Sequence, residues 1–518
     1  MTNEPNPNPP IPHCGPFIVT AQCGRSLRFS YRGVFQKSSL HGATLKSLRQ
    51  SGLLKPIVMQ MEAMPGKGNN FAARASSSTQ LGKFCNGAQR DIGKKVVVQV
   101  ARMYNTFMIR LISSGLLTIS MVEGLGKPVF SDKPAPLDIS NIHQLKAAAS
   151  KAMGNLMSYY HPNSEGTFDE DETPWHESGM IWDMHFDYAK WSGNTKFLRT
   201  VTQALTHQSR DDKHDFLGPN EQTEGQWNDD ILWPTVAAAD FYGAESKIPG
   251  SNTTWLQLAE KTFWEVSTKG QMDKTCGGGI FWYRDRKDSK GSYKSLITQL
   301  EFISQGARNY LINKNWKTLM LAQDVLEWVI SSGLGNARTG VLLDGIDVNK
   351  CSEFRDNQWS YNYGQFLGSL AWMSKATGNT RYMDFGVPFF NNSLRTFAPN
   401  NIITEPCEVT RSCNRDQQGF KAVYARNIAY YYRQSKDEDV KEKIRNVIST
   451  SIAAMISRSC DANYNCGGNW TLDTHPVKYV RSQHVSTALL VAAIGIHESS
   501  TSELLRVPRL PSRDKPAA

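Results

Sequence analysis

Apolar residues recur three and four positions apart through most of the chain beyond about residue 135, which is the spacing of a helix buried along one face. Gly, Pro or Asn punctuates each gap between these stretches. The pattern predicts a dozen helices and few strands, so the predicted fold class is all-α. The first helix opens at Asp138, and the others are expected over residues 177–193, 195–208, 228–244, 254–268, 293–313, 315–332, 360–377, 379–396, 416–435, 438–458 and 481–497.

One helix junction occurs twice. Gly193 and Gly378 are each followed by Asn-Thr and then, three residues beyond that Asn, by an aromatic residue, Phe197 or Tyr382. Such a glycine is typical of a left-handed cap, after which the next helix starts at once. Twelve helices in six hairpins need a closed partner surface, which favours an (α/α)6 barrel over residues 135–497. A helical solenoid is the rival, but the hairpin lengths are too uneven for a regular array.

Charge and tryptophan content divide the chain at about residue 125. Residues 1–125 carry 15 Lys/Arg against 4 Asp/Glu, whereas the rest carries 43 against 44. All 13 Trp lie at or beyond Trp175. The formal net charge of +10 therefore belongs to the first segment, and the main body offers no basic surface for phosphates. We expect no nucleic-acid partner.

Residues 103–126 have the layout of a secretory signal: a short basic flank, the mostly apolar run Leu111–Val122, and then small residues. The run is short for a membrane span, and an internal strand or buried helix is the alternative. We therefore expect residues 1–102 to be a basic extension with little regular structure, preceding a natural start at Met103 or Met108. The protein is then secreted, without a transmembrane span.

Six cysteines lie beyond residue 125, and they are Cys276, Cys351, Cys407, Cys413, Cys460 and Cys466. Cys407/Cys413 and Cys460/Cys466 share one close spacing, which suits two local disulfide loops and leaves Cys276 with Cys351. Six cysteines allow about 15 connectivities, so other pairings and unpaired thiols stay open. The even count with two matched loops favours an oxidising compartment.

Two further features bear on the cellular location. Asn252, Asn391 and Asn469 each begin an Asn-x-Ser/Thr sequon, which makes them candidates for glycosylation. Residues 498–518 form a polar tail of Ser, Arg and Pro, without the apolar end of a lipid-anchor attachment signal. Nothing in the sequence indicates an oligomer, and we expect a monomer.

Asp229 and Asp230 stand side by side at a predicted helix entrance. Glycoside hydrolysis commonly uses two carboxyl groups, one as nucleophile or base and one as a protonated acid. Neighbouring residues at a helix start point about 100° apart and can both face one cleft. Repulsion between them would raise the pKa of one carboxyl. A structural role fits the local pattern as well, because Asn228 is a good N-cap and acids suit the first helical turn.

Five short motifs follow one another along the predicted barrel. They are Trp175-His-Glu-Ser-Gly179-Met-Ile-Trp182, Trp227-Asn-Asp229-Asp230, Cys276-Gly-Gly-Gly279-Ile-Phe-Trp282, Asp344-Gly345 and Gln358-Trp359-Ser-Tyr361-Asn362. Together they resemble glycoside hydrolase family 76, the endo-α-1,6-mannanases, and most closely its fungal cell-wall members, which include glycan transferases. The segment from Cys407 to Ala422 resembles a later part of those members. The resemblance covers roughly residues 135–497.

The resemblance implies an (α/α)6 barrel and a reaction that retains the anomeric configuration, with Asp229 as nucleophile and Asp230 as general acid/base. The expected function is hydrolysis of α-1,6-mannosidic linkages within mannan or related cell-wall glycans, without a cofactor. One alternative transfers a mannose-containing glycan, such as that of a lipid anchor, to a wall polymer. An alternative of another class is a non-catalytic carbohydrate-binding barrel. The expected location is extracellular, in association with the cell wall.

Residues in and beside these motifs are candidates for substrate binding. Aromatic rings next to Gly-rich turns can stack on sugars, although aromatics on a helix more often pack in the core. The Gly277–Gly279 run either lets the backbone approach a ligand or simply forms a loop. The candidates are Trp175, Trp182, Asn228, Gly278, Trp282, Trp359, Tyr361 and Asn362. His176, Asp183 and His185 lack a recognised ligand spacing, so no metal site is predicted.

Two segments depart from the family pattern. A Tyr-Lys-Asn segment becomes Tyr293-Lys294-Ser295 here, and Trp-Thr-Tyr-Asn-Asn-Gly becomes Trp359-Ser-Tyr361-Asn362-Tyr363-Gly364. If these positions form sugar subsites, the preference for linkage or chain length differs from that of the family.

Overall fold

The structure is a computed structural model that describes three short strands near the N-terminus and most of residues 134–497. Within that span residues 135, 163–165, 169–172, 210–213, 218–223, 236–237 and 473–478 are not described. The chain divides into two compact units, Met1–Gly124 and Leu125–Ala518. The signal-like segment and the polar C-terminal tail predicted above lie outside the described residues. No described helix is long and apolar enough to cross a bilayer.

The first unit contains a small antiparallel sheet in the order β2-β1-β3, formed by Ile18–Gln22 (β1), Arg28–Arg32 (β2) and Phe71–Ala73 (β3). The central strand pairs with both neighbours, so that Val19 lies opposite Tyr31 on one side and Ala73 on the other. These strands were not predicted. That residues 1–102 precede the natural start stays a prediction.

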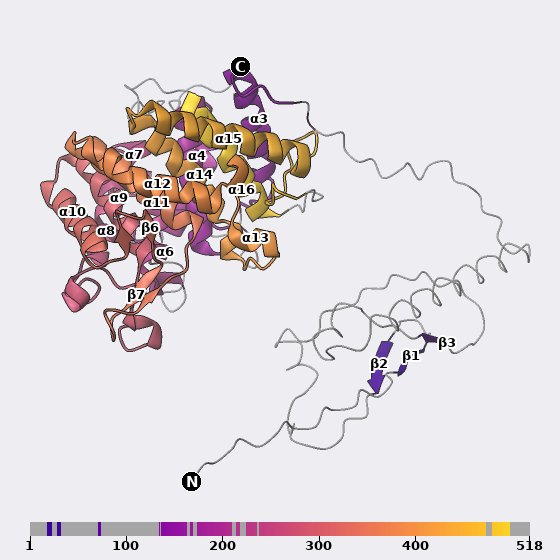
Figure 1. The fold of residues 1–518 in the computed structure, drawn as a ribbon, viewed down its shortest axis with the longest axis horizontal. Coiled ribbons are helices and arrows are strands. Elements are labelled where there is room, and N and C mark those ends of the chain that lie inside the picture. The colour runs from indigo at the N-terminus through magenta and orange to yellow at the C-terminus, as the bar shows by residue number, and fades with distance from the viewer. Residues whose placement is uncertain are drawn as a thin grey trace, which may run out of the picture. The chain divides into compact units, whose positions relative to one another are not determined.

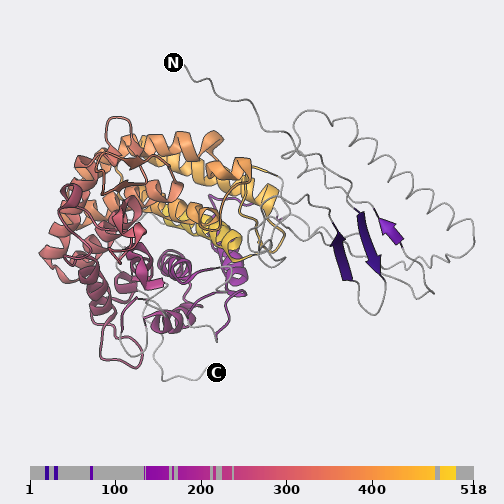
Figure 2. The same ribbon diagram turned by 90° about the horizontal axis from the view of Figure 1, so that it is seen from below.

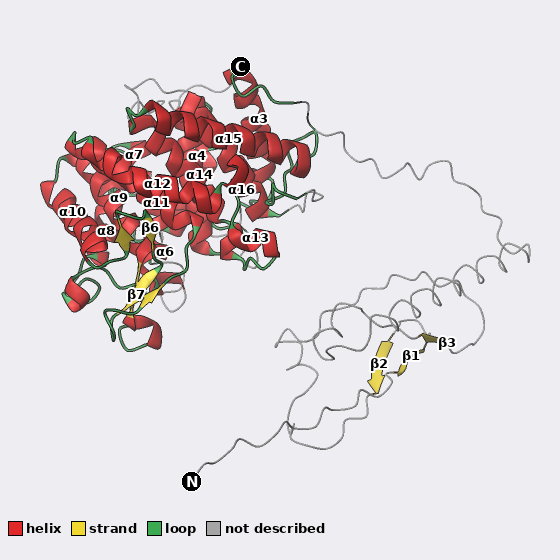
Figure 3. Ribbon diagram, in the orientation of Figure 1, coloured by secondary structure: helices red, strands yellow, loops and turns green. Residues whose placement is uncertain are grey.

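The second unit is built mainly from helices (Figures 1 and 3). The contacts between them show that they alternate along the chain between an outer and an inner layer. The outer helices are α3 (Ile142–Met157), α5 (Leu198–Gln208), α8 (Trp255–Val266), α10 (Trp316–Ser331), α12 (Arg381–Phe397) and α15 (Glu438–Ser459). The inner helices are α4 (Trp175–Ser192), α6 (Asn228–Leu232) with α7 (Ala238–Tyr242), α9 (Leu296–Asn313), α11 (Ser360–Thr377), α14 (Phe420–Gln434) and α16 (Val480–His497).

The inner layer closes into a ring. Around it, α4 packs on the α6–α7 segment, which packs on α9, and α9, α11, α14 and α16 follow in order before α16 returns to α4. Figure 2 shows the colour running round the unit, so that the first and last helices, α3 and α16, lie side by side. The predicted all-α fold and the (α/α)6 barrel are both confirmed.

The two layers differ in sequence because they differ in burial. The outer helix α12 buries one stripe with spacings of three and four, namely Met383, Gly386, Phe389, Phe390, Ser393 and Phe397. The inner helix α16 is buried at every position from Val480 to Ile496, polar residues included. Inner helices therefore place polar side chains inside the barrel, where each needs a partner.

Both predicted glycine caps are confirmed. Gly193 ends α4 and Gly378 ends α11, each in the left-handed conformation, with φ of 76° and 70°. Phe197 and Tyr382, the aromatic residues that follow, pack against the main hydrophobic core. The same short sequence therefore makes the same turn between an inner and an outer helix.

Several predicted boundaries were wrong. The single helix expected over residues 228–244 is broken into α6, a 3₁₀ turn at Trp233–Thr235 and α7. Pro234 lies in this turn, and proline lacks the N–H that a continuous helix needs. The helix expected from residue 293 begins at Leu296, after the strand Tyr293–Ser295 (β4).

Short strands and one short helix were missed. Strand β4 pairs with Gly345–Asp347 (β7), which pairs with Phe354–Arg355 (β8), and Gly335–Asn336 (β5) pairs with Val341–Leu342 (β6). The missed helix is α13 (Pro406–Thr410). Runs of two or three residues are too short to show a period of two.

The predicted disulfide pairing is confirmed in full: Cys276–Cys351, Cys407–Cys413 and Cys460–Cys466. The first pair closes a loop of 75 residues, whereas each of the others joins residues six apart. A disulfide restricts the unfolded chain more when its loop is longer.

We expect the Cys276→Ser/Cys351→Ser variant to be about 2 kcal/mol less stable than the Cys407→Ser/Cys413→Ser variant, because loop entropy grows with the logarithm of loop length. Urea unfolding of the two double variants measures both free energies. Equal losses, or a larger loss for the short loop, would contradict this account of the long disulfide.

Candidate active site

The first turns of the inner helices meet at one end of the barrel. Glu177 near the start of α4 forms a 2.8 Å ion pair with Arg481 near the start of α16. Tyr361 at the start of α11 stacks on Phe420 at the start of α14, with ring centroids 4.0 Å apart. Helix N-termini carry partial positive charge, so this end suits carboxylates and oxygen-rich ligands. Asp229 lies in the first turn of α6 at the same end.

Asn228 anchors the segment that carries the aspartate pair. Its side-chain amide donates to the Phe281 carbonyl at 2.8 Å and to Gln271 Oε1 at 2.9 Å, and its backbone N–H donates to the Trp282 carbonyl at 2.9 Å. Arg284 donates to its Oδ1 at 3.1 Å. The prediction that Asn228 is the N-cap was wrong, because Trp227 holds that place in extended conformation. With its hydrogen bonds used inside the protein, Asn228 positions its neighbour Asp229.

Asp229 is almost wholly buried, and its Oδ2 accepts a 2.9 Å hydrogen bond from the indole N–H of Trp282. Burial raises the pKa of Asp229 to about 6, opposed by the Trp282 hydrogen bond and by His176. A raised pKa within the pair was predicted, but burial rather than repulsion is its main cause. Above about pH 6 this carboxylate is ionised and is held in one orientation.

Asp230 has different surroundings. About 14% of its side chain is exposed, and its Oδ1 lies 3.6 Å from Nδ1 of His176 at the start of α4. Asp230 can therefore exchange a proton with solvent, whereas Asp229 is covered. Two adjacent carboxyl groups thus receive unlike environments, which separates their chemical roles.

A third carboxyl group lies beside the pair. Asp344 Oδ2 accepts from the Tyr293 hydroxyl at 2.7 Å, and its Oδ1 accepts from the Asn362 amide at 3.2 Å. Burial raises the pKa of Asp344, with the hydrogen bonds of Tyr293 and Asn362 opposing it. Burial and the charges of Asp344 and Asp229 hold the pKa of Tyr361 well above its usual range, so Tyr361 faces both carboxyls as a neutral phenol. Tyr293 and Asp344 were not among the predicted site residues, although Asp344 belongs to a quoted motif.

Half-buried aromatic rings surround this group. Trp359 meets Phe420 edge-on at 5.9 Å, and Phe420 in turn stacks on Tyr361. Trp282 lies edge-on to Trp227 at 6.2 Å. All five rings are partly exposed, so each can offer some of its surface to a sugar ring. Phe420 and Trp227 were not predicted as candidates.

The remaining two predicted tryptophans pack in the core. Trp182 has no exposed surface, stacks on Phe168 and donates its indole N–H to the Gly166 carbonyl at 2.8 Å. Trp175 is 2% exposed and packs edge-on against Phe216. Neither ring is available to a ligand in this structure.

The Gly277–Gly279 run is in contact with Lys294 and with Trp328. The Gly278 carbonyl accepts from Lys294 Nζ at 2.7 Å, and a Cβ added at Gly279 would lie 2.6 Å from the Trp328 ring. Gly277, Gly278 and Gly279 all have positive φ. Close packing against Trp328 therefore explains these glycines, and it fixes the loop that ends at Trp282.

Glu301 is a buried carboxyl inside the barrel, on α9 beyond the aspartate pair. Its side chain is wholly buried, and burial followed by the charges of Asp229, Asp230 and Asp183 raises its pKa well above the usual range. Burial therefore favours the neutral form of the Glu301 carboxyl. The sequence signal was a carboxylate in the middle of an otherwise apolar helical stretch.

The structure does not bring His176, Asp183 and His185 together as a set of metal ligands. Asp183 pairs with Arg426, and the ring of His185 contacts the Ile181 carbonyl through Nδ1, so these two belong to the core. The structure instead brings His176 together with Glu177 and Asp416, whose ligand atoms all lie within 4.8 Å of one another. Because Glu177 is already paired with Arg481, a cation there would compete with a guanidinium.

The three sequon asparagines lie outside the site. Asn252 is exposed, whereas Asn391 on α12 and Asn469 are half-buried. The Asn469 side chain accepts hydrogen bonds from the backbone of Thr471 and Leu472. Asn252 is the most accessible of the three glycosylation candidates.

Comparison with known proteins identifies the barrel. The family model described as glycosyl hydrolase family 76 matches residues 144–503. The chain belongs to glycosyl hydrolase family 76. The resemblance drawn from five motifs is confirmed, and this family 76 chain is a glycoside hydrolase by its membership.

The curated relatives of this family 76 chain include fungal proteins. Mannan endo-1,6-alpha-mannosidase DCW1 of Saccharomyces cerevisiae is 26% identical over 381 residues, which cover 71% of this chain and 84% of the relative. Mannan endo-1,6-alpha-mannosidase DFG5 of the same yeast is 24% identical over 378 residues, covering 70% and 80%.

Solved structures share the fold. Dfg5 from Chaetomium thermophilum, in complex with glucosamine, superposes with a TM-score of 0.63 at 22% identity over 72% of this chain and 94% of that one. An inactive variant of an α-1,6-mannanase from Salegentibacter sp. HEL1_6, with two consecutive aspartates replaced by asparagine and bound to α-1,6-mannotriose, gives 0.56 at 17% identity over 68% and 99%. Both likenesses concern the barrel.

Proposed function

We propose that this family 76 chain hydrolyses α-1,6-mannosidic linkages within mannan chains, with retention of configuration, through Asp229 as nucleophile and Asp230 as general acid/base. The observation that carries the proposal is the unlike environment of these neighbours: Asp229 is covered and oriented by Trp282, and Asp230 reaches solvent beside His176. Names of relatives support the substrate class, and so does the mannanase variant inactivated at two consecutive aspartates.

In the first step the Asp229 carboxylate attacks the anomeric carbon while Asp230 gives its proton to the glycosidic oxygen. The bond between that carbon and the oxygen breaks, which releases one mannan fragment as an alcohol and leaves the other as an ester of Asp229. The hydrogen bond from the Trp282 indole N–H to Oδ2 fixes the orientation of the Asp229 carboxylate during the attack.

In the second step the Asp230 carboxylate removes a proton from a water molecule, whose oxygen attacks the anomeric carbon and restores the Asp229 carboxylate. Two inversions return the original configuration. If a sugar hydroxyl takes the place of water, the same chemistry joins the glycan to an acceptor. Asp344, which accepts a 2.7 Å hydrogen bond from Tyr293, is our candidate for binding a sugar hydroxyl next to the reacting carbon.

We further infer that the enzyme acts outside the cell, on the cell wall. The three disulfides support an oxidising compartment, and the relatives are fungal enzymes named for mannan. Asn252, exposed in a sequon, is the first position to examine for an attached glycan by peptide mass spectrometry.

The test is incubation of the full chain with a linear α-1,6-mannooligosaccharide, followed by mass analysis of product lengths. We expect shorter products, and their absence from a parallel reaction with Asp229→Asn. Products longer than the substrate would assign glycan transfer instead. No change of length with the folded, oxidised protein would contradict both and favour a carbohydrate-binding barrel.

Trp282 offers a pH-dependent test of the nucleophile. Because its N–H stabilises the ionised carboxylate, Trp282→Phe should raise the pKa of Asp229 above its value of about 6. Activity requires ionised Asp229, so the acid limb of kcat/KM against pH should move upward by about one unit. Trp316→Phe, at a 57% exposed position on α10, is the matched control. An unmoved acid limb in Trp282→Phe would refute the role of this hydrogen bond.

A further inference from the structure

A buried glutamine on α9 binds the chain two residues before Trp282. Gln299 lies in the first turn of α9 and has no exposed surface. Its Oε1 accepts a hydrogen bond from the Ile280 N–H at 2.8 Å, and its Nε2 donates to the Ile280 carbonyl at 2.7 Å. Nε2 also donates to the Ser295 carbonyl, just before the same helix, at 2.9 Å. The oxygen and both N–H groups of this amide are therefore used, and they fix Ile280 to the start of α9.

A buried lysine holds the same stretch of chain on either side of Ile280. Lys294 of β4 has no exposed surface. Its Nζ donates to the Gly278 carbonyl at 2.7 Å, to the Thr275 carbonyl at 2.9 Å and to Asp273 Oδ1 at 3.0 Å, which uses all three N–H groups of the ammonium. Nζ also lies 4.2 Å from the centre of the Phe281 ring, as a cation–π contact. Residues 278–282 are therefore held by two buried side chains.

Residues 278–282 end at the ring that orients the nucleophile. The Trp282 indole N–H donates to Asp229 Oδ2 at 2.9 Å. The carbonyls of Phe281 and Trp282 accept the hydrogen bonds of Asn228 described above. This segment therefore reaches Asp229 twice, through its carboxylate and through the residue before it. The two buried side chains bind the segment rather than Asp229, so their influence on the carboxylate passes through the segment.

We propose that Gln299 and Lys294 are positioning residues for the nucleophile, because they hold residues 278–282 where the Trp282 indole N–H meets Asp229 Oδ2. The inference rests on the function proposed above and adds two residues that act at a distance from the sugar. Without either side chain the segment loses its fixed place, so the Trp282 hydrogen bond weakens and the carboxylate loses its orientation. The signature of each replacement is therefore that of losing the Trp282 hydrogen bond.

Gln299→Met removes the amide without changing the charge of the protein. We expect kcat on the mannooligosaccharide to fall about 10- to 100-fold with KM nearly unchanged, because a misplaced nucleophile costs the transition state more than it costs binding. The acid limb of kcat/KM against pH should move upward by about half a unit to one unit, because ionised Asp229 loses the donor that Trp282→Phe removes. A fall in Tm with an unmoved acid limb would overturn the proposal.

Double variants separate the route through Trp282 from a direct effect of charge. Lys294→Met removes a cation together with its hydrogen bonds, and a lost positive charge also raises the pKa of a nearby carboxyl. In a Trp282→Phe background the hydrogen bond to Asp229 is already absent, so neither Gln299→Met nor Lys294→Met should move the acid limb further. Shifts as large in that background as in the parent protein would show that the two residues do not act through Trp282.

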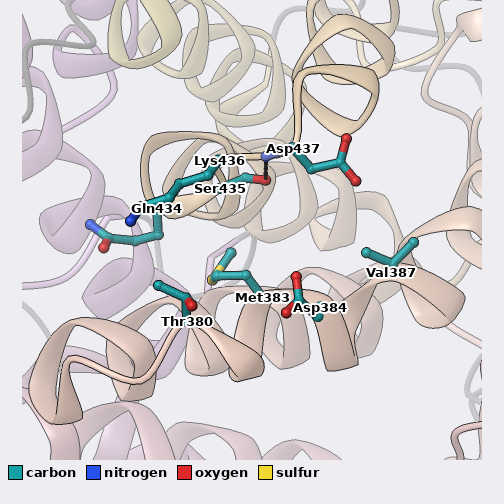
Figure 4. A pocket seen from close by; sticks show the side chains of 8 residues that line it. All are labelled: Thr380, Met383, Asp384, Val387, Gln434, Ser435, Lys436 and Asp437. Atoms are coloured by element: carbon teal, nitrogen blue, oxygen red, sulfur yellow. Dashed lines mark hydrogen bonds between the residues drawn. The ribbon is translucent and has the colours of Figure 1, made fainter.

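Lys436→Met is the matched control for replacing a lysine. Lys436 is exposed in the turn from α14 to α15, where it lines a small cavity together with Met383 and Asp384 of α12 (Figure 4). This turn follows the last residue of α14, which lies about 21 Å along the helix from Phe420 at the catalytic end. The control should keep the kcat, KM and acid limb of the parent protein. A control that lost kcat together with the two variants would overturn the proposal.

A crystal structure of full-chain Gln299→Met gives a readout that needs no substrate. We expect residues 278–282 to shift and the distance from Trp282 Nε1 to Asp229 Oδ2 to exceed about 3.5 Å, beyond a hydrogen bond. An indole that still donates to Asp229 would overturn the positioning role, whatever the activity. A shifted indole in a protein whose parent cuts no mannooligosaccharide would support the positioning role while the proposed function fails.

Discussion

Replacing either aspartate of the pair is expected to remove turnover. Asp229→Asn and Asp230→Asn should each lower kcat on a mannooligosaccharide by at least about 10³-fold, since the first loses the nucleophile and the second loses the proton donor. Asparagine keeps the shape, and the Trp282 hydrogen bond can persist in Asp229→Asn. The two variants should therefore fold, with Tm values close to that of the parent protein.

A mannoside with a good leaving group separates the two roles. Such a leaving group needs no proton, so Asp230→Asn should regain the bond-breaking step while Asp229→Asn should not. Asp324→Asn, at an exposed position on α10, is the control for replacing an acid and should keep full activity. Rescue of Asp229→Asn instead would reverse the assignment, and activity in both variants would refute it.

The largest loss of stability is expected from Arg426→Met. Arg426 lies inside the barrel and donates to Asp187 at 2.8 Å through Nε and to Asp183 at 2.6 Å through Nη2. Without the guanidinium, two buried carboxylates face each other uncompensated, which costs about 3–5 kcal/mol. Urea unfolding measures the loss. Lys443→Met, which removes an exposed ion pair with Asp439 on α15, should cost less than about 1 kcal/mol.

The pH dependence of that variant gives a second check. The pKa of Asp187 is already raised, chiefly by burial, with Arg426 as the largest opposing influence. Removing Arg426 raises it further, and a carboxyl whose folded pKa lies above its unfolded pKa loses stability as the pH rises. The deficit of Arg426→Met should therefore be larger at pH 7 than at pH 5. A deficit that is equal at both, or as small as that of Lys443→Met, would show that the buried ion pair does not hold the barrel together.

The helical periodicity of the sequence predicted most of the helices in the fold. Outer helices such as α12 bury one stripe with spacings of three and four, whereas the inner helix α16 is buried all round. The glycine caps at Gly193 and Gly378 mark two of the hairpins directly. The break after α6 depends on tertiary packing as well as on Pro234. A Cβ at Gly179 of α4 would lie 3.0 Å from Pro234, so the turn is pressed against the neighbouring helix. Such a contact cannot be read from local pattern.

The candidate site was found only in part. The local sequence pattern alone also allowed a structural role for Asp229 and Asp230. The family motifs favoured a catalytic role for the pair. Trp182 and Trp282 stand in similar motifs, yet one is a core residue and the other donates to Asp229. Trp182 lies within the inner helix α4, whereas Trp282 lies in the loop that follows the glycine run, and the local sequence pattern does not distinguish these two places. Asp344 and Tyr293 meet through the pairing of β4 with β7, which has no sequence signal of its own.

The central claim is that Asp229 forms a covalent bond to the sugar. The direct measurement is peptide mass mapping of the full chain after incubation with a 2-fluoro mannosyl or mannobiosyl fluoride, whose ester intermediate hydrolyses slowly. We predict the added mass of one fluorinated glycosyl group, mannosyl or mannobiosyl according to the reagent, on the peptide that contains Asp229, located on Asp229 itself by fragmentation and absent from Asp229→Asn. A label on Asp230 or Asp344, or products of inverted configuration without any label, would contradict the account.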